Sequence, residues 1–177
     1  MTQRISRREM LRNTAMAGIG TWIAGSTSAS YGSLPSEKLN IACIGIGGRG
    51  RANLNSLANQ NIVALCDVDD SRAGNAYAKF PKAKKFYDFR KMFDSMSKDI
   101  DAVSVSTPDH AHFHPAVATL ELGKHLYCEK PMAHSVEEVR IMTDLARKQK
   151  VATQLGVQRH TIGNVHRVVE LIRKKAI

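Results

Sequence analysis

Short apolar runs alternate with longer segments of helical spacing along this chain from residue 36 onward. The runs are apolar on both faces, which is typical of strands buried in a parallel sheet. Strict alternation of such strands with helices favours an α/β fold, a doubly wound parallel sheet covered by helices on each side. We expect strands at 39–46, 61–66, 84–87, 101–106, 124–128 and 151–155, and helices at 48–59, 70–79, 89–97, 109–122, 135–149 and 161–175. Ser135 and Glu138 have the spacing of a capping box.

Three glycines at the spacing G-x-G-x-x-G lie between the first expected strand and helix, in the stretch IACIGIGGRGRAN. Gly45 permits a tight turn, Gly47 lets backbone amides approach a pyrophosphate, and Gly50 lets helix and strand pack closely. The helix N-terminus then faces the phosphates. Gly48 and Arg49, in the same loop, are also expected to contact the cofactor. The loop predicts a dinucleotide-binding Rossmann domain; the alternative is a Rossmann-like domain that binds another nucleotide or nothing.

An acidic residue, Asp67, ends the second expected strand about 20 residues beyond the first glycine, as in domains that bind the adenosine ribose. Its carboxylate could accept hydrogen bonds from both ribose hydroxyls and would repel a 2′-phosphate. The cofactor expected is therefore NAD rather than NADP. Arg72 weakens this preference, because a guanidinium could reach a 2′-phosphate.

The first residues have the layout of an export signal. Arg7 and Arg8 precede a mildly apolar, uncharged stretch and then a series of small residues. They resemble a twin-arginine signal, with Met10 where that pattern usually has Phe, and we expect cleavage near Ala29. The protein would be periplasmic and would meet the membrane only transiently; an uncleaved membrane anchor is the alternative. The domains expected are a signal at 1–29, a linker at 30–37, a dinucleotide-binding domain at 38–160 and a further helix at 161–177.

The formal net charge of +10 would suit a polyanionic partner if the basic residues were clustered. Four arginines lie in the first dozen residues and the rest are scattered over helix faces, so no nucleic-acid partner is expected. The three cysteines lie in or beside apolar runs, which favours buried thiols over disulfides. His110 and His114 could share a helical face, but no carboxylate or cysteine completes a metal-ligand set at a suitable spacing. No metal is expected.

The segment STPDHAHFHPAVATLELGKHLYCEKPMA, residues 106–133, strongly resembles the Gfo/Idh/MocA oxidoreductases, and the Glu129-Lys130-Pro131 triplet is its most specific feature. The resemblance extends from about Leu39 to the end of the chain. It implies an NAD-dependent enzyme acting on a sugar or cyclitol hydroxyl. It also implies a second substrate domain, absent or truncated here, so that this chain would be the nucleotide-binding part of a longer protein or a truncated gene product.

The resemblance also implies roles for individual residues. Lys130 would contact the substrate and belong to the proton relay, because a neutral lysine can take the hydroxyl proton as hydride leaves. Glu129 would contact the nicotinamide ribose, and His112 would lie beside the cofactor. Apart from the resemblance, the proline in Thr107-Pro108 favours an extended turn, which would lie against the nicotinamide half. Gln158 follows the sixth expected strand and would line the same crevice. The alternative for Glu129 and Lys130 is a surface ion pair.

Three functions stay open at this point. The first is an NAD-dependent sugar or cyclitol dehydrogenase, with a homo-oligomer allowed in a full-length protein. The second is an NAD-using glycosidase of the same family, which would return the hydride and produce no net NADH. The third is a non-catalytic dinucleotide-binding module.

Overall fold

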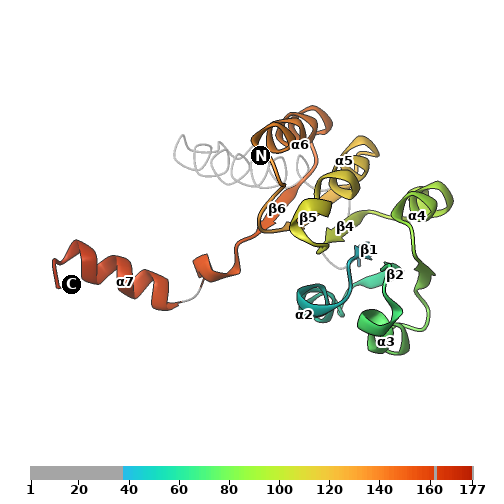
Figure 1. Cartoon of the computed structure of the whole chain (residues 1–177), viewed down its shortest axis with the longest axis horizontal. Helices are drawn as coiled ribbons and strands as arrows, with labels where there is room; N and C mark the ends of the chain where they lie inside the picture. Colours follow the sequence, from blue (N-terminus) through green and yellow to red (C-terminus); the bar gives the residue numbers. More distant parts are fainter. Residues whose placement is uncertain (1–37, 162, 177) are drawn as a thin grey trace, which may run out of the picture. The chain divides into compact units, whose positions relative to one another are not determined.

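The structure is a computed structural model of the chain and describes residues 38–161 and 163–176 (Figure 1). The expected signal at 1–29 and linker at 30–37 lie outside the described residues. No helix within the described part of the chain is both long and apolar enough to cross a membrane.

Six parallel strands form one sheet in the order β3-β2-β1-β4-β5-β6. This order confirms the doubly wound α/β fold, because the chain adds strands to one side of β1 and then crosses to add the others at its second side. The strands are β1 (Asn40–Ile44), β2 (Asn61–Cys66), β3 (Lys84–Phe86), β4 (Ala102–Val105), β5 (His125–Glu129) and β6 (Thr153–Gly156).

Helices join these strands, close to where the sequence predicts them. Two begin at aspartate caps, and Ser135 and Glu138 form the predicted capping box. The helices are α2 (Gly48–Ser56), α3 (Asp70–Lys79), α4 (Phe89–Met96), α5 (Phe113–Glu121), α6 (Val136–Gln149) and α7 (Gly163–Arg173), with short 3₁₀ turns η1 (Ser97–Asp99), η2 (Asp109–Ala111) and η3 (Gln158–Thr161).

The helix expected at 109–122 is divided in the structure. A 3₁₀ turn, η2, comes first, and α5 begins only at Phe113. Pro115 explains the break, because it has no N–H to bond to the carbonyl of Ala111 and is tolerated only in the first turn of a helix. His112 lies between the two pieces and turns its ring into the protein.

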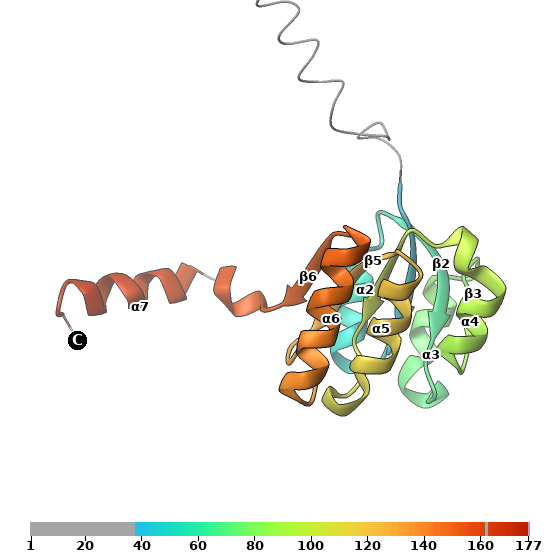
Figure 2. The ribbon, with the colours of Figure 1, turned by 90° about the horizontal axis from the view of Figure 1, so that it is seen from above.

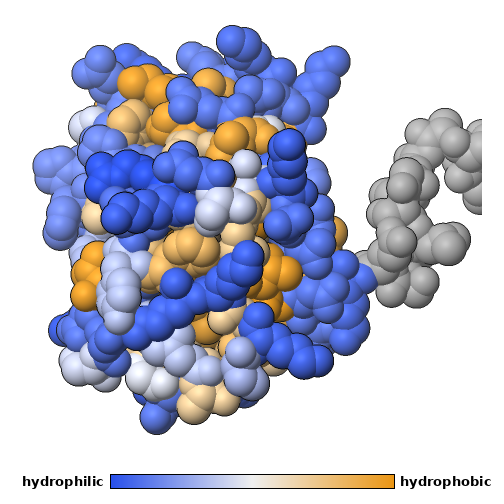
Figure 3. Space-filling view, turned by 90° about the vertical axis from the view of Figure 1, so that its right-hand side faces the viewer, coloured by the Kyte–Doolittle hydropathy of each residue, from blue (hydrophilic) through white to orange (hydrophobic). Residues whose placement is uncertain are grey.

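The strands are apolar on both faces because each face is covered. Along β1, Ile41 and Cys43 pack against the layer of α2 and α3, whereas Ala42 and Ile44 pack against the layer of α4, α5 and α6. The two layers lie on opposite sides of the sheet in Figures 1 and 2. Hydrophilic side chains cover most of the face drawn in Figure 3, with apolar surface visible between them. Such a buried sheet leaves its carboxyl edge, where the loops begin, as the place for a ligand.

Candidate functional site

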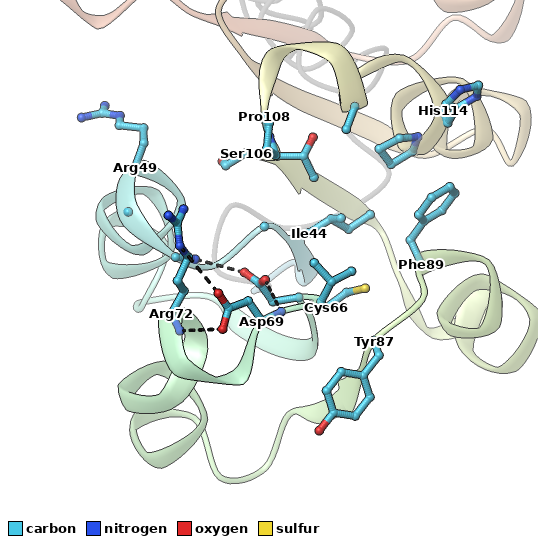
Figure 4. Close-up of a pocket in the computed structure, with 18 of the residues that line it drawn as sticks. Ile44, Arg49, Cys66, Asp69, Arg72, Tyr87, Phe89, Ser106, Pro108 and His114 are labelled. Carbon is cyan, nitrogen blue, oxygen red and sulfur yellow. Dashed lines mark hydrogen bonds and ion pairs between the residues drawn. The ribbon is translucent and has the colours of Figure 1, made fainter.

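A cleft of about 700 Å³ lies beside the carboxyl ends of β1, β2 and β4, where the strand order reverses (Figure 4). Its volume lies within the range of small-molecule sites. Of the residues predicted for the cofactor, seven line the cleft: Gly45, Gly47, Gly48, Arg49, Asp67, Thr107 and Pro108. Five predicted site residues are not in its lining: Gly50, His112, Glu129, Lys130 and Gln158.

The glycine loop is shaped by close backbone contacts. Gly45 has a φ of +76°, and a Cβ atom there would lie 2.7 Å from the carbonyl of Ser106. A Cβ at Gly50 would lie 1.8 Å from the carbonyl oxygen of Gly45, so α2 can cross β1 this closely only with glycine at that position. At Gly47, a Cβ would lie 2.9 Å from Cβ of Arg72. The geometry therefore agrees with the close packing expected of Gly50, although Gly47 is constrained by Arg72.

No side chain caps the N-terminus of α2. Gly47 is the N-cap residue, and the first turn of the helix contains no acidic residue. The first backbone N–H groups of a helix have no partners within the helix, and they carry the positive end of its dipole. This end of α2 is therefore suited to an anionic group such as a pyrophosphate.

The carboxylate of Asp67 accepts three hydrogen bonds from backbone N–H groups of the protein itself. Its Oδ2 accepts hydrogen bonds from the backbone N–H groups of Ile46 and Gly47, at 2.8 and 3.2 Å, and its Oδ1 accepts one from Asp69 at 3.0 Å. A carboxylate offers about four lone-pair positions, so about one remains for a ligand. The structure thus gives Asp67 room for one ribose hydroxyl rather than both, because its second role is to hold the glycine loop.

Asp69 and Arg72 lie at the same side of the cleft as Asp67, and Figure 4 shows them across from Phe89 and His114. Asp69 caps α3 with Oδ1, which accepts hydrogen bonds from the backbone and hydroxyl of Ser71. Its Oδ2 lies 3.7 Å from Nε of Arg72. The hydrogen bonds from Ser71 lower the pKa of Asp69, so it carries a negative charge.

Glu129 lies at the end of β5 and is the centre of a buried polar cluster. Glu129 is only 5% exposed. Its Oε1 lies within hydrogen-bonding distance of four donors, which belong to α2, β5 and η3. These donors are Nδ2 of Asn53 at 2.8 Å, Nε of Arg49 at 3.2 Å, the hydroxyl of Tyr127 at 3.1 Å and Nε2 of Gln158 at 2.5 Å. Gly156 leaves the space for this cluster, since a Cβ there would lie 2.7 Å from the Tyr127 hydroxyl and 2.8 Å from Glu129.

The cluster holds Glu129 in its charged form. Burial acts to raise the pKa of Glu129, but the hydrogen bonds from Asn53, Arg49 and Tyr127 outweigh it, and the pKa lies below its ordinary value. Burial, above all, raises the pKa of Tyr127, which keeps its hydroxyl protonated as a donor. Asn53 and Tyr127 were not predicted from the sequence. The position of Asn53, one helical turn after Arg49, is the signal that could have found it.

His112 joins two loops at the carboxyl edge of the sheet. The residue is 1% exposed; its Nε2 lies 2.8 Å from the carbonyl oxygen of Thr107, and its Nδ1 lies 2.6 Å from that of Pro131. Its ring therefore connects the loop after β4 to the loop after β5, and it does not line the cleft itself. Among the described residues, the hydroxyl of Thr107 is buried and has no hydrogen-bond partner.

Lys130 is exposed directly after β5, and its peptide bond with Pro131 is cis. Within the described part of the chain, Glu129 forms its ion pair with Arg49 and not with Lys130. The surface ion pair considered from the sequence is therefore not the arrangement found. No group of three or more His, Cys, Asp or Glu side chains able to hold a metal ion is found among residues 38–161 and 163–176.

The sheet order, the glycine loop and the acidic residue at the end of β2 define a dinucleotide-binding Rossmann domain. The model of the Gfo/Idh/MocA oxidoreductase family, NAD-binding Rossmann fold, matches residues 39–157. The chain belongs to this family and contains its NAD-binding domain.

The curated proteins that are similar in sequence to this chain include both a glycosyl hydrolase and a dehydrogenase. A glycosyl hydrolase family 109 protein of Solibacter usitatus is 32% identical over 174 residues, covering 89% of this chain and 38% of the relative. The inositol 2-dehydrogenase of Salmonella typhimurium is 32% identical over 127 residues, covering 68% of this chain and 37% of the relative. The chain thus spans less than two fifths of the length of these relatives.

Solved structures show the same fold. Scyllo-inositol dehydrogenase from Lactobacillus casei, with bound NAD(H) and scyllo-inositol, matches with a TM-score of 0.66 at 23% identity. The match covers 80% of this chain and 42% of that one.

Proposed function

We propose that this chain binds NAD as the nucleotide-binding part of an oxidoreductase that acts on a sugar or cyclitol hydroxyl. The observation that carries the proposal is the uncapped N-terminus of α2 beside Asp67, within a cleft of about 700 Å³. The inositol and sugar dehydrogenases among the relatives support the substrate class.

The residues present fit NAD. Gly45, Gly47 and Gly48 line the cleft and have no side chains, so a ligand can approach the backbone of the loop there. The first amides of α2 would hold the pyrophosphate, and the remaining position on Asp67 would take a ribose hydroxyl. NAD, when bound, supplies the acceptor for hydride.

Lys130 is proposed as the proton site for the substrate hydroxyl. It follows β5 at the ligand-binding edge of the sheet, and it is exposed. In an active protein carrying this chain, Lys130→Met should leave the Kd for NAD within about twofold of wild type. The hydride step should slow by roughly 10²–10⁴-fold, as for other acid–base groups. A wild-type rate in single turnover at saturating NAD would remove Lys130 from the mechanism.

The test of the proposed cofactor is calorimetric titration of the chain with NAD and with NADP. We expect NAD to bind more tightly, and we expect Asp67→Asn to weaken the binding of NAD. Equal or reversed affinities in the wild-type chain would overturn the assignment of NAD. Binding of neither dinucleotide would overturn the proposed function.

A second candidate function is NAD-using glycoside hydrolysis, favoured by the similarity to the glycosyl hydrolase family 109 protein. The two functions differ in their products. A dehydrogenase accumulates NADH as substrate is consumed, whereas an enzyme that returns the hydride releases a sugar with no net NADH.

Export is a separate proposal that rests on the sequence of residues 1–29. We propose that the paired arginines direct the folded protein through a twin-arginine route to the periplasm. Changing Arg7 and Arg8 together to lysine should stop export and leave folding unaltered. Normal periplasmic levels of the lysine variant would contradict this proposal.

A further inference from the structure

The two oxygens of the Asp69 carboxylate have different surroundings. Oδ1 is used in capping α3, through Ser71 N at 2.9 Å, Ser71 Oγ at 2.6 Å and Arg72 N at 3.4 Å. Oδ2 makes no such bond and faces Nε of Arg72 at 3.7 Å. The side chain is 44% exposed and lines the cleft. A cap requires only one acceptor oxygen, so the second oxygen and the full charge of Asp69 go beyond what the helix needs.

Arg72 is fixed at its base and exposed at its tip. Its Cβ lies beside Gly47, and its carbonyl oxygen accepts a hydrogen bond from the guanidinium of Arg51. The side chain itself is 77% exposed, and it also lines the cleft. An arginine in this region of a Rossmann domain can hold the 2′-phosphate of NADP. Here its nearest acidic group is Asp69 rather than Asp67.

Asp69 and Arg72 adjoin the position where the adenosine ribose would lie. The backbone N–H of Asp69 donates to Oδ1 of Asp67, the oxygen with a lone-pair position left for a ribose hydroxyl. The carboxylates of Asp67 and Asp69 line the cleft here together with Arg72, and the guanidinium of Arg51 contacts the carbonyl oxygen of Arg72. The two carboxylates repel a 2′-phosphate with a charge of about −2, whereas they do not repel a ribose without a phosphate.

We propose that Asp69 is a second residue, beside Asp67, that determines the choice of NAD over NADP. Its carboxylate repels a 2′-phosphate and also holds Arg72 in an ion pair, so that the guanidinium is not offered to that phosphate. This proposal rests on the proposed NAD-binding function and adds to it the residue pair that sets cofactor specificity.

Asp69→Asn separates the charge of Asp69 from its capping role. Asparagine is as good an N-cap as aspartate, so α3 should keep its start. The amide Nδ2 would replace Oδ2 and would face another donor in Arg72, which releases the guanidinium. We expect the Kd for NADP to fall on the order of tenfold, the size of a Coulomb effect at an exposed site, with the Kd for NAD changed by less than about threefold. The gain should shrink as ionic strength rises.

Asp144→Asn is the matched control. Asp144 also pairs with an arginine three residues later, with Oδ1 of Asp144 at 3.8 Å from Nη1 of Arg147, and both side chains are exposed. It lies on α6, outside the cleft lining, and its substitution changes the net charge by the same amount. In Asp144→Asn, the ratio of the Kd for NAD to the Kd for NADP should stay at its wild-type value.

A double variant, Asp69→Asn with Arg72→Gln, tests the part played by Arg72. We expect it to lose the part of the gain in NADP binding that comes from the released guanidinium, while the part that comes from the lost repulsion stays. Calorimetric titrations of all four proteins with NAD and NADP give the outcome, and far-ultraviolet circular dichroism checks that α3 is retained. The proposal is overturned if Asp69→Asn leaves the ratio of the Kd values for NAD and NADP unchanged, and the part assigned to Arg72 is overturned if the gain survives fully in the double variant. If the wild-type chain binds neither dinucleotide, it is the proposed function that fails instead.

Discussion

Replacing Gly50 by alanine should damage the protein far more than its single added methyl group suggests. The new Cβ would lie 1.8 Å from the carbonyl oxygen of Gly45, 2.8 Å from the carbonyl carbon and 3.1 Å from Cβ of Ser106. The first two of these atoms are backbone at the end of β1 and cannot rotate away, so α2 must move. Overpacking usually costs about 1–3 kcal/mol, and a clash with fixed backbone belongs at the upper end.

We therefore expect Gly50→Ala to lower the free energy of unfolding by about 3 kcal/mol, or the Tm by roughly 10 °C. The same shift would displace the amides at the N-terminus of α2, so the affinity for NAD should fall by at least about tenfold. Urea unfolding followed by circular dichroism gives the first quantity, and calorimetric titration gives the second.

Two other glycines are matched controls. Gly48 has a φ of +48°, and no atom lies within 4 Å of the place that an alanine methyl group would take, so Gly48→Ala should cost only the backbone term of about 1 kcal/mol. Gly74 lies within α3 in open space, and Gly74→Ala should stabilise the protein by about 0.5–1 kcal/mol without altering NAD binding. If Gly50→Ala matched Gly74→Ala in both assays, the close crossing of α2 over β1 would be refuted.

The remaining predictions concern the buried polar groups. Glu129→Leu should lower the free energy of unfolding by about 1–3 kcal/mol in urea titrations, because it leaves the buried amide of Asn53 without its acceptor and the half-exposed Arg49 without its ion-pair partner; a loss below about 1 kcal/mol would count against the cluster. Since the pKa of Glu129 is lowered on folding, its contribution is present above the unfolded pKa near about 4.3 and is lost as pH falls through the lower folded value. Glu129→Gln should therefore flatten the pH dependence of stability in that acid range, and an unchanged slope would contradict the assignment. His112→Leu should cost about 1–3 kcal/mol, because a neutral imidazole donates one hydrogen bond and the carbonyl of Thr107 or of Pro131 that accepts it would be left unpaired; thermal unfolding that matches wild type would disprove this.

The pattern of the sequence was sufficient for the fold because each signal is local. Apolar runs and caps such as Ser135 with Glu138 act within a few residues, and the strands and most helices lie where they predict. The division of the helix expected at 109–122 was also predictable, since Pro115 is in the sequence. Apolar periodicity alone predicts one continuous helix there, because it takes no account of the missing N–H.

The surroundings of Glu129 could not be predicted in the same way. Its donors Asn53 and Gln158 lie 76 and 29 positions away along the chain, and only the strand order brings them to the end of β5. The hydrogen bonds that Asp67 accepts from the glycine loop could not be predicted either, because they depend on how the end of β2 lies beside that loop. A glycine in the β6 strand was one usable signal, because glycine within a strand often marks the close approach of another group, and Gly156 does so here.

The cluster around Glu129 limits how this domain can be redesigned. A glycine loop is a tempting segment to transplant between Rossmann domains, because its sequence is short and continuous. In this protein the segment would carry Arg49 and Asn53 with it, and both require the carboxylate at the end of β5. A recipient without the matching acid, tyrosine and strand glycine would have to bury the amide of Asn53 unpaired and would leave Arg49 without its ion-pair partner. The transferable unit is therefore a set of positions scattered from the first helix to the last strand, and a chimera should exchange them together.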